Sequence, residues 1–296
     1  MKRTAVSYLA LTAVVMLAAM GCKKDEPNKT EWKLGYPKSG DVYAAGYDEY
    51  KHYVQNSSVA KLWKNGVAQY LTDGTREAWA YSVYVSGGDV YVAGQVGNVA
   101  TLWKNGVAQY LMDGTREAWA YSVYVSGGDV YVAGSYLSNV SDNEVAVVWK
   151  NGVKQNLSDG TRKAGANSIY VSGNDMYVAG YEFDERGDAT PTLWKNGIKQ
   201  SLAGYGSAFS VFVSNNDVYV SGWKYHVATL WKNGVAQSLT TDGYASGHSV
   251  YVSGNDVYVA GQVGNVATLW KNGVVQSLIL TSDGNNSRAY SVFVVE

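Results

Sequence analysis

Short runs of apolar residues alternate with turn residues along most of the chain. In residues 121–157, four such runs cover residues 121–125, 130–134, 145–149 and 153–157. Each run has the usual length of a β-strand, and the Asn-Gly pair between the last two favours a type I′ hairpin turn. We find no helical period in this pattern, so it predicts antiparallel strands joined by tight turns.

Three motifs recur six times each, always in the same order. The first, SV(Y/F)V or SIYV, begins at Ser82, Ser122, Ser168, Ser210, Ser249 and Ser291. The second, similar to DVYVAG, begins at Asp41, Asp89, Asp129, Asp175, Asp217 and Asp256. The third, WKNG, begins at Trp63, Trp103, Trp149, Trp194, Trp231 and Trp270. The period of about 43 residues is that of propeller blades.

Both faces of each predicted strand pair are apolar, because Val83 and Val85 oppose Tyr84. Sheets buried on both faces need neighbours on both sides, which a ring of blades provides. We therefore predict an all-β six-bladed β-propeller with four-stranded antiparallel blades. Buried Tyr and Trp dominate its core, and we expect all six tryptophans of WKNG to pack there.

The order of motifs at the chain ends predicts how the ring closes. The repeats begin with the second, third and fourth strands of a unit, and they end with an isolated first strand at residues 291–294. Closing a loop of this length costs roughly 5 kcal/mol, and closure removes two exposed strand edges. We expect one C-terminal strand and three N-terminal strands to form the sixth blade.

The repeat resembles kelch-type and WD40-type propeller units over residues 41–296. The features that carry the resemblance are an apolar strand, a Gly-containing turn, a Tyr-bearing strand ending in small residues, and then a Trp. Kelch units end the second strand in Gly-Gly, whereas this chain has pairs such as Ala93-Gly94. The resemblance implies the fold and carries over no functional residue.

Composition narrows the function classes. The chain has 296 residues, of which 46% are hydrophobic, with 25 Tyr, 10 Trp and 33 Gly but 3 Pro, and this balance also favours β structure. The formal net charge of −1 gives no basic footprint for nucleic acid. No phosphate-binding loop or nucleophile motif occurs, and the three scattered histidines have no Cys partners for a metal, so we expect no cofactor.

The first residues differ from the rest of the chain. Lys2 and Arg3 precede an apolar run that ends in Gly21 and Cys22, the single cysteine, as in a secretory signal. Residues 19–22 resemble the lipobox of bacterial lipoproteins, although Ala19 replaces the usual Leu. The following Lys-Lys-Asp-Glu resembles an export tag of Gram-negative bacteria.

These resemblances imply a signal peptide at 1–21, an acylated tether at 22–39 and the propeller at 40–296. The lipid on Cys22 would anchor the protein in the outer membrane, facing the cell exterior. An uncleaved anchor followed by an ordinary charge run is the alternative.

Sequence variation among the repeats indicates where a ligand would bind. The turns between first and second strands and between third and fourth strands share one face and are nearly constant. The other connections share the opposite face and carry every insertion, at residues 47–58, 135–144 and 181–190. Binding residues are commonly placed on loops of a rigid scaffold, so we assign the site to this second face, which we call the variable face.

Aromatic and cationic residues gather in the sequence of the variable face. The candidate ligand-binding residues are Arg76, Trp79, Arg116, Trp119, Arg162, Tyr205, Trp223, Tyr244 and His248. Exposed aromatics beside Arg suit stacking on a sugar or anchoring a protein. Trp79 and Trp119 have an alternative role in capping their own blades.

The sequence supports a catalytic role poorly. The recurring Asp of the second motif is expected to make Asx-turns, since it is repeated in every unit. Carboxylates that break the repeat are Asp142, Glu144, Asp184, Glu185 and Asp188, which could bind Ca²⁺ or act as an acid and a base.

We therefore expect a monomeric, non-enzymatic surface lipoprotein that binds a glycan or a protein. The alternative is a propeller hydrolase or lyase that degrades polysaccharide.

Overall fold

The computed structural model describes residues 37–51, 56–241, 243–276 and 287–294, which form 23 β-strands. Within these ranges no helix is long and apolar enough to cross a bilayer. The predicted signal peptide, Cys22 and most of the tether lie outside the described residues.

The strands repeat in a fixed order, and we call them first to fourth within each sheet. The first strands are β4 (Ala78–Ser86), β8 (Ala118–Ser126), β12 (Ala164–Ser172), β16 (Gly206–Ser214) and β20 (Ala245–Ser253). The second strands are β1 (Tyr43–Lys51), β5 (Asp89–Val96), β9 (Asp129–Leu137), β13 (Asp175–Phe183), β17 (Asp217–Lys224) and β21 (Asp256–Val263). The third strands are β2 (Asn56–Lys64), β6 (Val99–Lys104), β10 (Glu144–Lys150), β14 (Ala189–Lys195), β18 (Val227–Lys232) and β22 (Val266–Lys271). The fourth strands are β3 (Val67–Tyr70), β7 (Val107–Tyr110), β11 (Val153–Asn156), β15 (Ile198–Ser201), β19 (Val235–Ser238) and β23 (Val274–Gln276).

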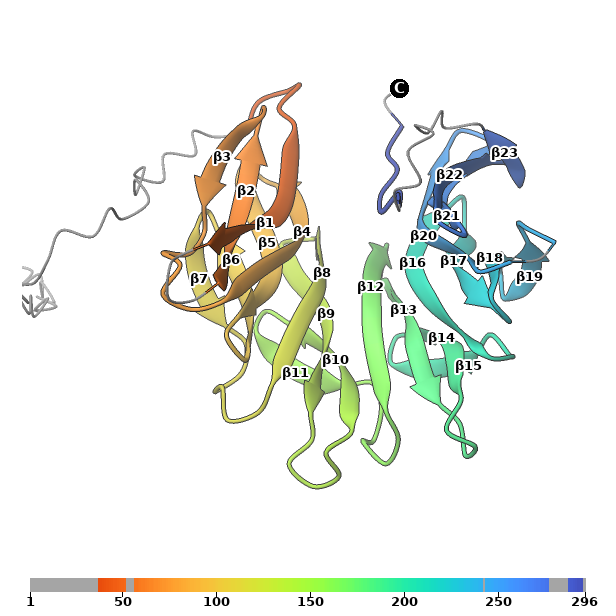
Figure 1. Ribbon diagram of the computed structural model, residues 1–296, viewed down its shortest axis with the longest axis horizontal. Coiled ribbons are helices and arrows are strands. Elements are labelled where there is room, and N and C mark those ends of the chain that lie inside the picture. The colour runs from red at the N-terminus through yellow and green to blue at the C-terminus, as the bar shows by residue number, and fades with distance from the viewer. Residues whose placement is uncertain (1–36, 52–55, 242, 277–286, 295–296) are drawn as a thin grey trace, which may run out of the picture.

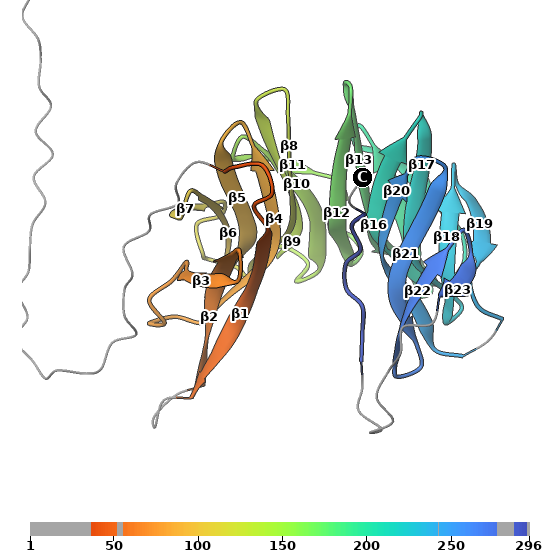
Figure 2. The ribbon, with the colours of Figure 1, turned by 90° about the horizontal axis from the view of Figure 1, so that it is seen from above.

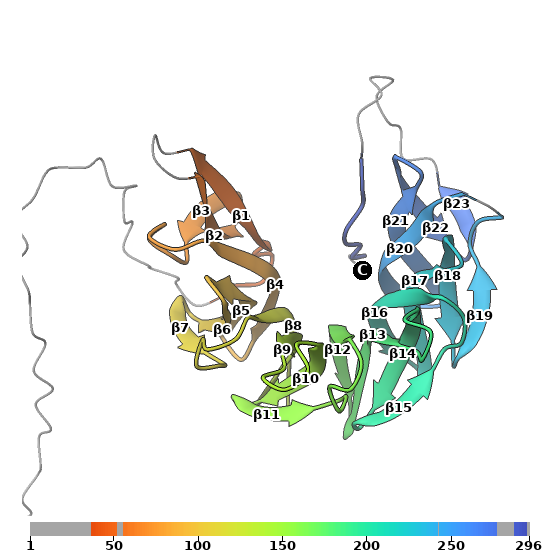
Figure 3. The same ribbon diagram turned by 60° about the horizontal axis from the view of Figure 1, so that its bottom comes forward.

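These strands form six antiparallel sheets, which confirms the prediction of a six-bladed β-propeller. Five sheets have four strands, and the sheet β1-β2-β3 has three. Figure 3 shows the sheets following one another in an arc, with the first strand of each innermost and the fourth outermost. The described part of the chain thus contains six blades, which we number by their first motif along the chain: β4–β7 is blade 1, β20–β23 is blade 5, and β1–β3 belongs to blade 6.

The inner strands are longer than the sequence predicts. β8 and β9 each span nine residues, not five, because their pairing continues past the apolar run toward the variable face. Each first strand also contains a β-bulge, for example between Gly247 and Ser249 in β20. A bulge leaves one residue out of the ladder and redirects its side chain, here His248.

The tryptophans of WKNG pack between neighbouring blades. Trp103, Trp149, Trp194, Trp231 and Trp270 are all 0% exposed. Trp149, for example, packs with Leu102 and Leu111 of the preceding blade. Trp63 is only half-buried, which corrects the prediction of six equivalent core tryptophans. The physical reason is that β1–β3 has no sheet packed on the side where the other tryptophans meet a preceding blade (Figure 3).

One polar network recurs on the face opposite the variable face. In blade 2, Asn151 donates to Asp129 at 2.7 Å and accepts from the Val130 amide at 2.9 Å, while Lys150 pairs with Asp129 at 2.8 Å. Asn151 has a φ of 51° and Gly152 a φ of 79°, as a type I′ turn requires. The recurring Asp is therefore structural, as predicted, and its recurring partners are the Asn and Lys side chains of WKNG, while the Asn side chain accepts the backbone amide. A bond to the nearby backbone occurs at Asp41, which accepts the Lys38 amide at 2.8 Å.

Two ladders join successive first strands. In one, a Ser hydroxyl accepts the backbone N–H of the next blade, as Ser82 does from Val123 at 3.2 Å. In the other, aromatic rings from Tyr84 to Tyr251 pack against one another in tilted pairs, with centroids 4.7 to 5.0 Å apart. The C-terminal segment extends both ladders: the Val292 amide donates to Ser249 at 3.3 Å, and Phe293 lies 4.9 Å from Tyr251.

Ring closure by this segment stays a prediction. Figures 1 and 2 show residues 287–294 lying in the gap between the two ends of the arc. Their contacts with β20 are those of a first strand, yet no pairing between this segment and β1 occurs among the described residues.

Candidate functional site

The three predicted arginines of the variable face hold their own loops. Arg76 donates to the carbonyl of Val96 at 3.1 Å, and Arg116 donates to the carbonyl of Ser138 at 3.0 Å. Arg162 pairs with Glu185 at 3.1 Å. In each blade the Arg precedes the first strand and reaches the connection between the second and third strands. These side chains therefore tie the two connections of the variable face together.

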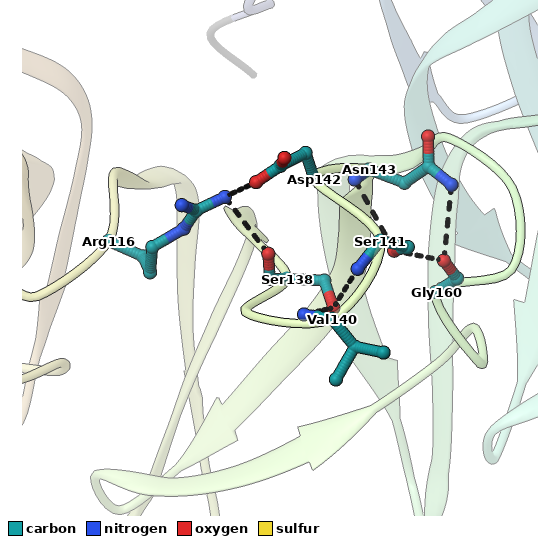
Figure 4. A network of polar contacts seen from close by, with 7 residues as sticks. All are labelled: Arg116, Ser138, Val140, Ser141, Asp142, Asn143 and Gly160. Carbon is teal, nitrogen blue, oxygen red and sulfur yellow. Dashed lines mark hydrogen bonds and ion pairs between the residues drawn. The ribbon is translucent and has the colours of Figure 1, made fainter.

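The β9–β10 loop shows this fixation in detail (Figure 4). Arg116 pairs with Asp142 from one side. On the other side, Ser141 donates to the Gly160 carbonyl at 2.7 Å, and the Asn143 amide donates to the same oxygen at 3.3 Å. The insertion at residues 135–144 is thus held in place by hydrogen bonds and an ion pair.

The carboxylates considered for catalysis also have structural partners. Asp184 accepts the amides of Arg186 and Asp188, at 2.8 and 3.0 Å, and the hydrogen bond from the Asp188 amide holds its pKa below the ordinary value. Glu144 accepts the Tyr181 hydroxyl at 2.8 Å and pairs with Lys163 at 3.0 Å. Burial, and then the charge of Glu144, raise the pKa of Tyr181. No group of three or more His, Cys, Asp or Glu that could hold a metal occurs within the described ranges.

Four aromatic side chains meet at the junction of blades 4 and 5. The ring of His226 stacks on Trp223, with centroids 5.5 Å apart and an interplanar angle of 12°. Tyr205 packs edge-on against Trp223 at 4.9 Å, and Tyr244 packs against His226 at 4.8 Å. We call Tyr205, Trp223, His226 and Tyr244 the aromatic cluster. Tyr244 is 74% exposed, so the cluster faces solvent.

A shallow pocket of about 160 Å³ opens beside this cluster. Its lining residues are Trp223, His226, Tyr244, Ala245, Ser246 and Gln262. The aromatic residues provide flat apolar walls, while Ser246 and Gln262 provide a hydroxyl and an amide. Such a combination of apolar surface and few polar groups is typical of small-molecule sites.

His248 lies behind the pocket. Its Nε2 is 3.2 Å from the hydroxyl of Ser246, and its ring stacks on Phe209 at 5.4 Å. Tyr290 of the C-terminal segment lies on its other side at 5.3 Å. Burial lowers the pKa of His248, against the opposing effect of the nearby Gln262 side chain, so the imidazole is neutral near pH 7.

The turn that carries His226 has an unusual backbone. Tyr225 and His226 join β17 to β18, and both have positive φ, at 53° and 65°. The equivalent turns of blades 1 and 5 are Gly97-Asn98 and Gly264-Asn265. Bulky residues at positive φ are strained, and such strain concentrates at functional sites. This turn holds the ring of His226 against Trp223.

The structure brings together part of the predicted site. Tyr205, Trp223 and Tyr244 lie in the aromatic cluster, and His248 supports the pocket. Trp79 and Trp119 are half-buried in β4 and β8, in other blades. Sequence reasoning missed Ser246 and Gln262 as lining residues. Aligning the repeats could have found them, because large aromatic residues stand at these positions in other blades.

Comparisons with known proteins support the fold. Neither a protein-family model nor a curated protein sequence matches the chain. Among solved structures, a chain of the crystal structure of a nidogen/laminin complex has a TM-score of 0.51 at 10% identity, covering 84% of this chain and 97% of that one.

Two further structures are similar at lower scores. A mutant Trypanosoma rangeli sialidase with trans-sialidase activity has a TM-score of 0.45 at 8% identity, covering 80% of this chain and 51% of that one. TolB from Acinetobacter baumannii has a TM-score of 0.47 at 11% identity, covering 80% and 62%. Identities this low concern the fold alone.

Proposed function

We propose that this chain is a non-enzymatic binding protein that holds a glycan on the variable face of its propeller, at the junction of blades 4 and 5. The single observation that carries this proposal is the aromatic cluster with its pocket. Aromatic rings offer a flat apolar surface for the C–H face of a sugar, and the polar groups beside them can bind its hydroxyls.

The other polar candidates of the variable face support binding over catalysis. Arg116 and Arg162 are paired with Asp142 and Glu185, and Asp184 accepts two backbone amides. A hydrolase or lyase needs carboxylates poised toward substrate. A polysaccharide-degrading activity carried by these carboxylates remains the alternative hypothesis, and loss of turnover in Asp184→Ala and Glu185→Ala variants would favour it.

The proposed location of the protein is the outer face of a bacterial outer membrane, through a lipid on Cys22. The lipobox-like sequence at residues 19–22 supports this part of the proposal. A surface protein with an anchored tether meets glycans and other surface proteins, which agrees with a binding role. Radiolabelled palmitate incorporated into the wild type and absent from Cys22→Ala would support the anchor, and equal labelling would contradict it.

A glycan array tests the binding function directly. We expect the soluble propeller, residues 37–296, to bind at least one glycan, and a Trp223→Ala, Tyr244→Ala variant to lose that binding. The matched control is Trp79→Ala, Trp119→Ala, which removes two aromatics of the same face from other blades and should keep binding. Binding lost in the control but kept in the first variant would move the site to blades 1 and 2. Binding of no glycan, with capture of a protein from the native envelope that depends on Trp223, would show a protein partner instead.

A further inference from the structure

The pocket arises where one aromatic residue is missing from the repeat. In each blade, one residue of the first strand lies directly across from one of the second strand, close to the variable face. These pairs are Trp79 with Gln95, Trp119 with Ser135, Gly165 with Tyr181, Ser207 with Trp223, and Ser246 with Gln262. Blades 1 to 4 each contribute one large aromatic residue to the pair, and blade 5 contributes none.

Blade 3 shows what the aromatic residue does in this position. A Cβ atom added to Gly165 would lie 2.8 Å from Cε1 of Tyr181, so the ring covers its small partner. In blades 2 and 4 the partners of the tryptophans are Ser135 and Ser207, which are both buried. In blades 1 to 4 an aromatic residue thus faces a buried partner, which we call the filled form of this position. Ser246 of blade 5 is also only 8% exposed, but the residue across from it is Gln262.

In blade 5 both residues lack an aromatic ring, and both line the pocket. The walls come from elsewhere: Trp223 from blade 4, His226 from the strained turn, and Tyr244 from the segment before β20. The corresponding residues of blade 1 and of the segment before β8 are Gln95, Asn98 and Glu117, none of which is aromatic. The opening and the aromatic walls therefore occur together at one place.

We propose that this opening is a receptor for one neutral pyranose ring, held between the aromatic walls with its hydroxyls on Ser246 and Gln262. This inference depends on the proposed glycan-binding function and names the part of the glycan that is recognised.

The volume of the pocket favours a ligand of a single sugar ring. A volume of about 160 Å³ is close to that of an engineered cavity of about 150 Å³ that binds one benzene ring. Pockets for drug-sized ligands have about 300 Å³ or more. The pocket therefore takes one sugar residue, and any further residues of the glycan lie across the exposed aromatics outside.

The side chains that line the pocket favour an uncharged sugar ring. Among the described residues, the side chains that line the pocket include no carboxylate, ammonium or guanidinium group. A sugar acid would lose hydration and would find no guanidinium or ammonium group to pair with, only the imidazole of His226. A wholly apolar ligand would offer no hydrogen bond to the Ser246 hydroxyl or to the Gln262 amide, which both line the pocket.

The residue pair of blade 2 is the template for a variant in which the pocket is filled. A Ser246→Trp, Gln262→Ser variant gives blade 5 the Trp-Ser pair that blade 2 has at Trp119 and Ser135. The control is Trp119→Ser, which makes the blade 2 pair small on both strands without aromatic walls beside it. Circular dichroism melting shows whether each variant folds as the wild type does.

Saturation-transfer difference NMR is measured with the methyl glycosides of glucose, galactose, mannose and N-acetylglucosamine, and with methyl glucuronide, at millimolar concentration. We expect the wild type and Trp119→Ser to bind at least one neutral glycoside, and the filled variant to bind it about tenfold more weakly or not at all. Equal binding by the filled variant, binding of none of the neutral glycosides, or preference for the glucuronide would overturn the inference.

The glycan array separates this failure from that of the proposed function. Array binding that persists in the Ser246→Trp, Gln262→Ser variant would leave glycan binding intact and remove the pocket from it. Absence of array binding by the wild type would refute both. If the filled variant does not fold, Gln262→Ala with Ser246→Val takes its place, because it removes both polar groups and should abolish glycoside binding with the pocket still open.

Discussion

The face that carries the Asn-Gly turns repeats one network in all six sheets, whereas the variable face changes around the arc, although blades 1 and 5 share their Gly-Asn turn. On the first face, Asn donates to Asp at 2.6 to 2.8 Å and Lys pairs with the same Asp at 2.6 to 3.0 Å in each sheet. On the variable face, the loops differ in length, in charge and in backbone conformation. Uniform sequence on the first face thus maintains the hairpins, and the residues that differ among the blades lie on the variable face, where we propose that the ligand binds.

The same contrast is found at one position near the variable face, where a residue of the first strand faces one of the second strand. Four blades fill the position from either strand, and blade 5 leaves it open beside Trp223 and Tyr244. A change that restores uniformity should therefore affect binding and leave the fold intact, whereas a change in the repeated core should do the reverse.

The largest effect is expected from removing the segment that continues both inter-blade ladders. Deleting residues 290–296 removes the contacts of Val292 and Phe293 with β20 and prevents the closure that we predict. Phe293 is 71% exposed where the arc is open, and closure that buries it and Val292 would contribute roughly 2 kcal/mol for each side chain. We expect the free energy of unfolding to fall by about 4 kcal/mol or more, measured by urea denaturation. Closure would also bury Trp63. Acrylamide should therefore quench the fluorescence of Trp63 more strongly in the truncated protein than in the full chain. Unchanged melting after truncation would refute the closure.

The next largest effect is a difference in stability between alanine variants of two tryptophans in blade 2. Trp149 is 0% exposed and packs between blades, so Trp149→Ala should destabilise the protein by about 3–5 kcal/mol. Trp119 is half-buried at the variable face, and Trp119→Ala should cost clearly less. Urea denaturation of both variants measures the difference. Equal losses would mean that the variable face is as much a part of the core as the inter-blade tryptophans.

Acid should weaken the repeated network of Asp, Asn and Lys side chains. The hydrogen bond from Lys150, and then that from Asn151, lower the pKa of Asp129, and the same pairing lowers the pKa of Asp89 and Asp175. For Asp41, hydrogen bonds led by the one from Asn65 lower the pKa to about 2. A carboxylate with a depressed folded-state pKa stabilises the fold fully above its ordinary pKa of 3.8, and this contribution is lost as the pH falls toward the folded-state value.

We therefore expect the melting temperature to decrease between pH 4 and pH 2, and to decrease less steeply in a variant with Asn at positions 89, 129 and 175. Melting curves across this range measure both slopes. Asp142→Asn is the control, because it removes a carboxylate of the variable face from outside the repeated network and should leave the slope as it is. A slope unchanged by the triple substitution would assign acid sensitivity to other groups.

The smallest change in stability should accompany a large change in binding. A Tyr225→Gly, His226→Asn variant restores the Gly-Asn turn of blades 1 and 5 and relieves two positive φ angles. We expect it to be more stable by about 1 kcal/mol, while losing the His226 ring that stacks on Trp223 and with it most of the glycan binding. Urea denaturation and the glycan array measure the two effects. Lower stability with full binding would show that the strained turn serves the fold.

The repeat made most of the fold predictable from the sequence. Six copies of WKNG specify the hairpins, because Asn and Gly readily adopt the positive φ angles that a type I′ turn requires, as Asn151 and Gly152 do. The extra length of β8 and β9 was not predictable, because their ends continue into residues with no alternating pattern. The partner of the recurring Asp was missed because a bond to Asn across a hairpin depends on register, which the motif alone does not display.

The site was predictable only in part. Composition pointed to aromatic residues of the variable face, and three of them do meet. Arg76, Arg116 and Arg162 looked like ligand groups, yet they bind loop carbonyls and carboxylates of their own blades. Which aromatic residues lie together depends on how blades 4 and 5 meet. The opening at Ser246 is recognised by the missing aromatic residue in the pair of Ser246 and Gln262, which is found once the strands are aligned.

The most direct test of the central claim is a crystal structure of the protein soaked with the strongest ligand of the glycan array. The account predicts a sugar ring in the pocket, against Trp223 and Tyr244 and within hydrogen-bonding distance of Ser246. A ligand bound beside Trp79 and Trp119, or on the face that carries the Asn-Gly turns, would contradict it.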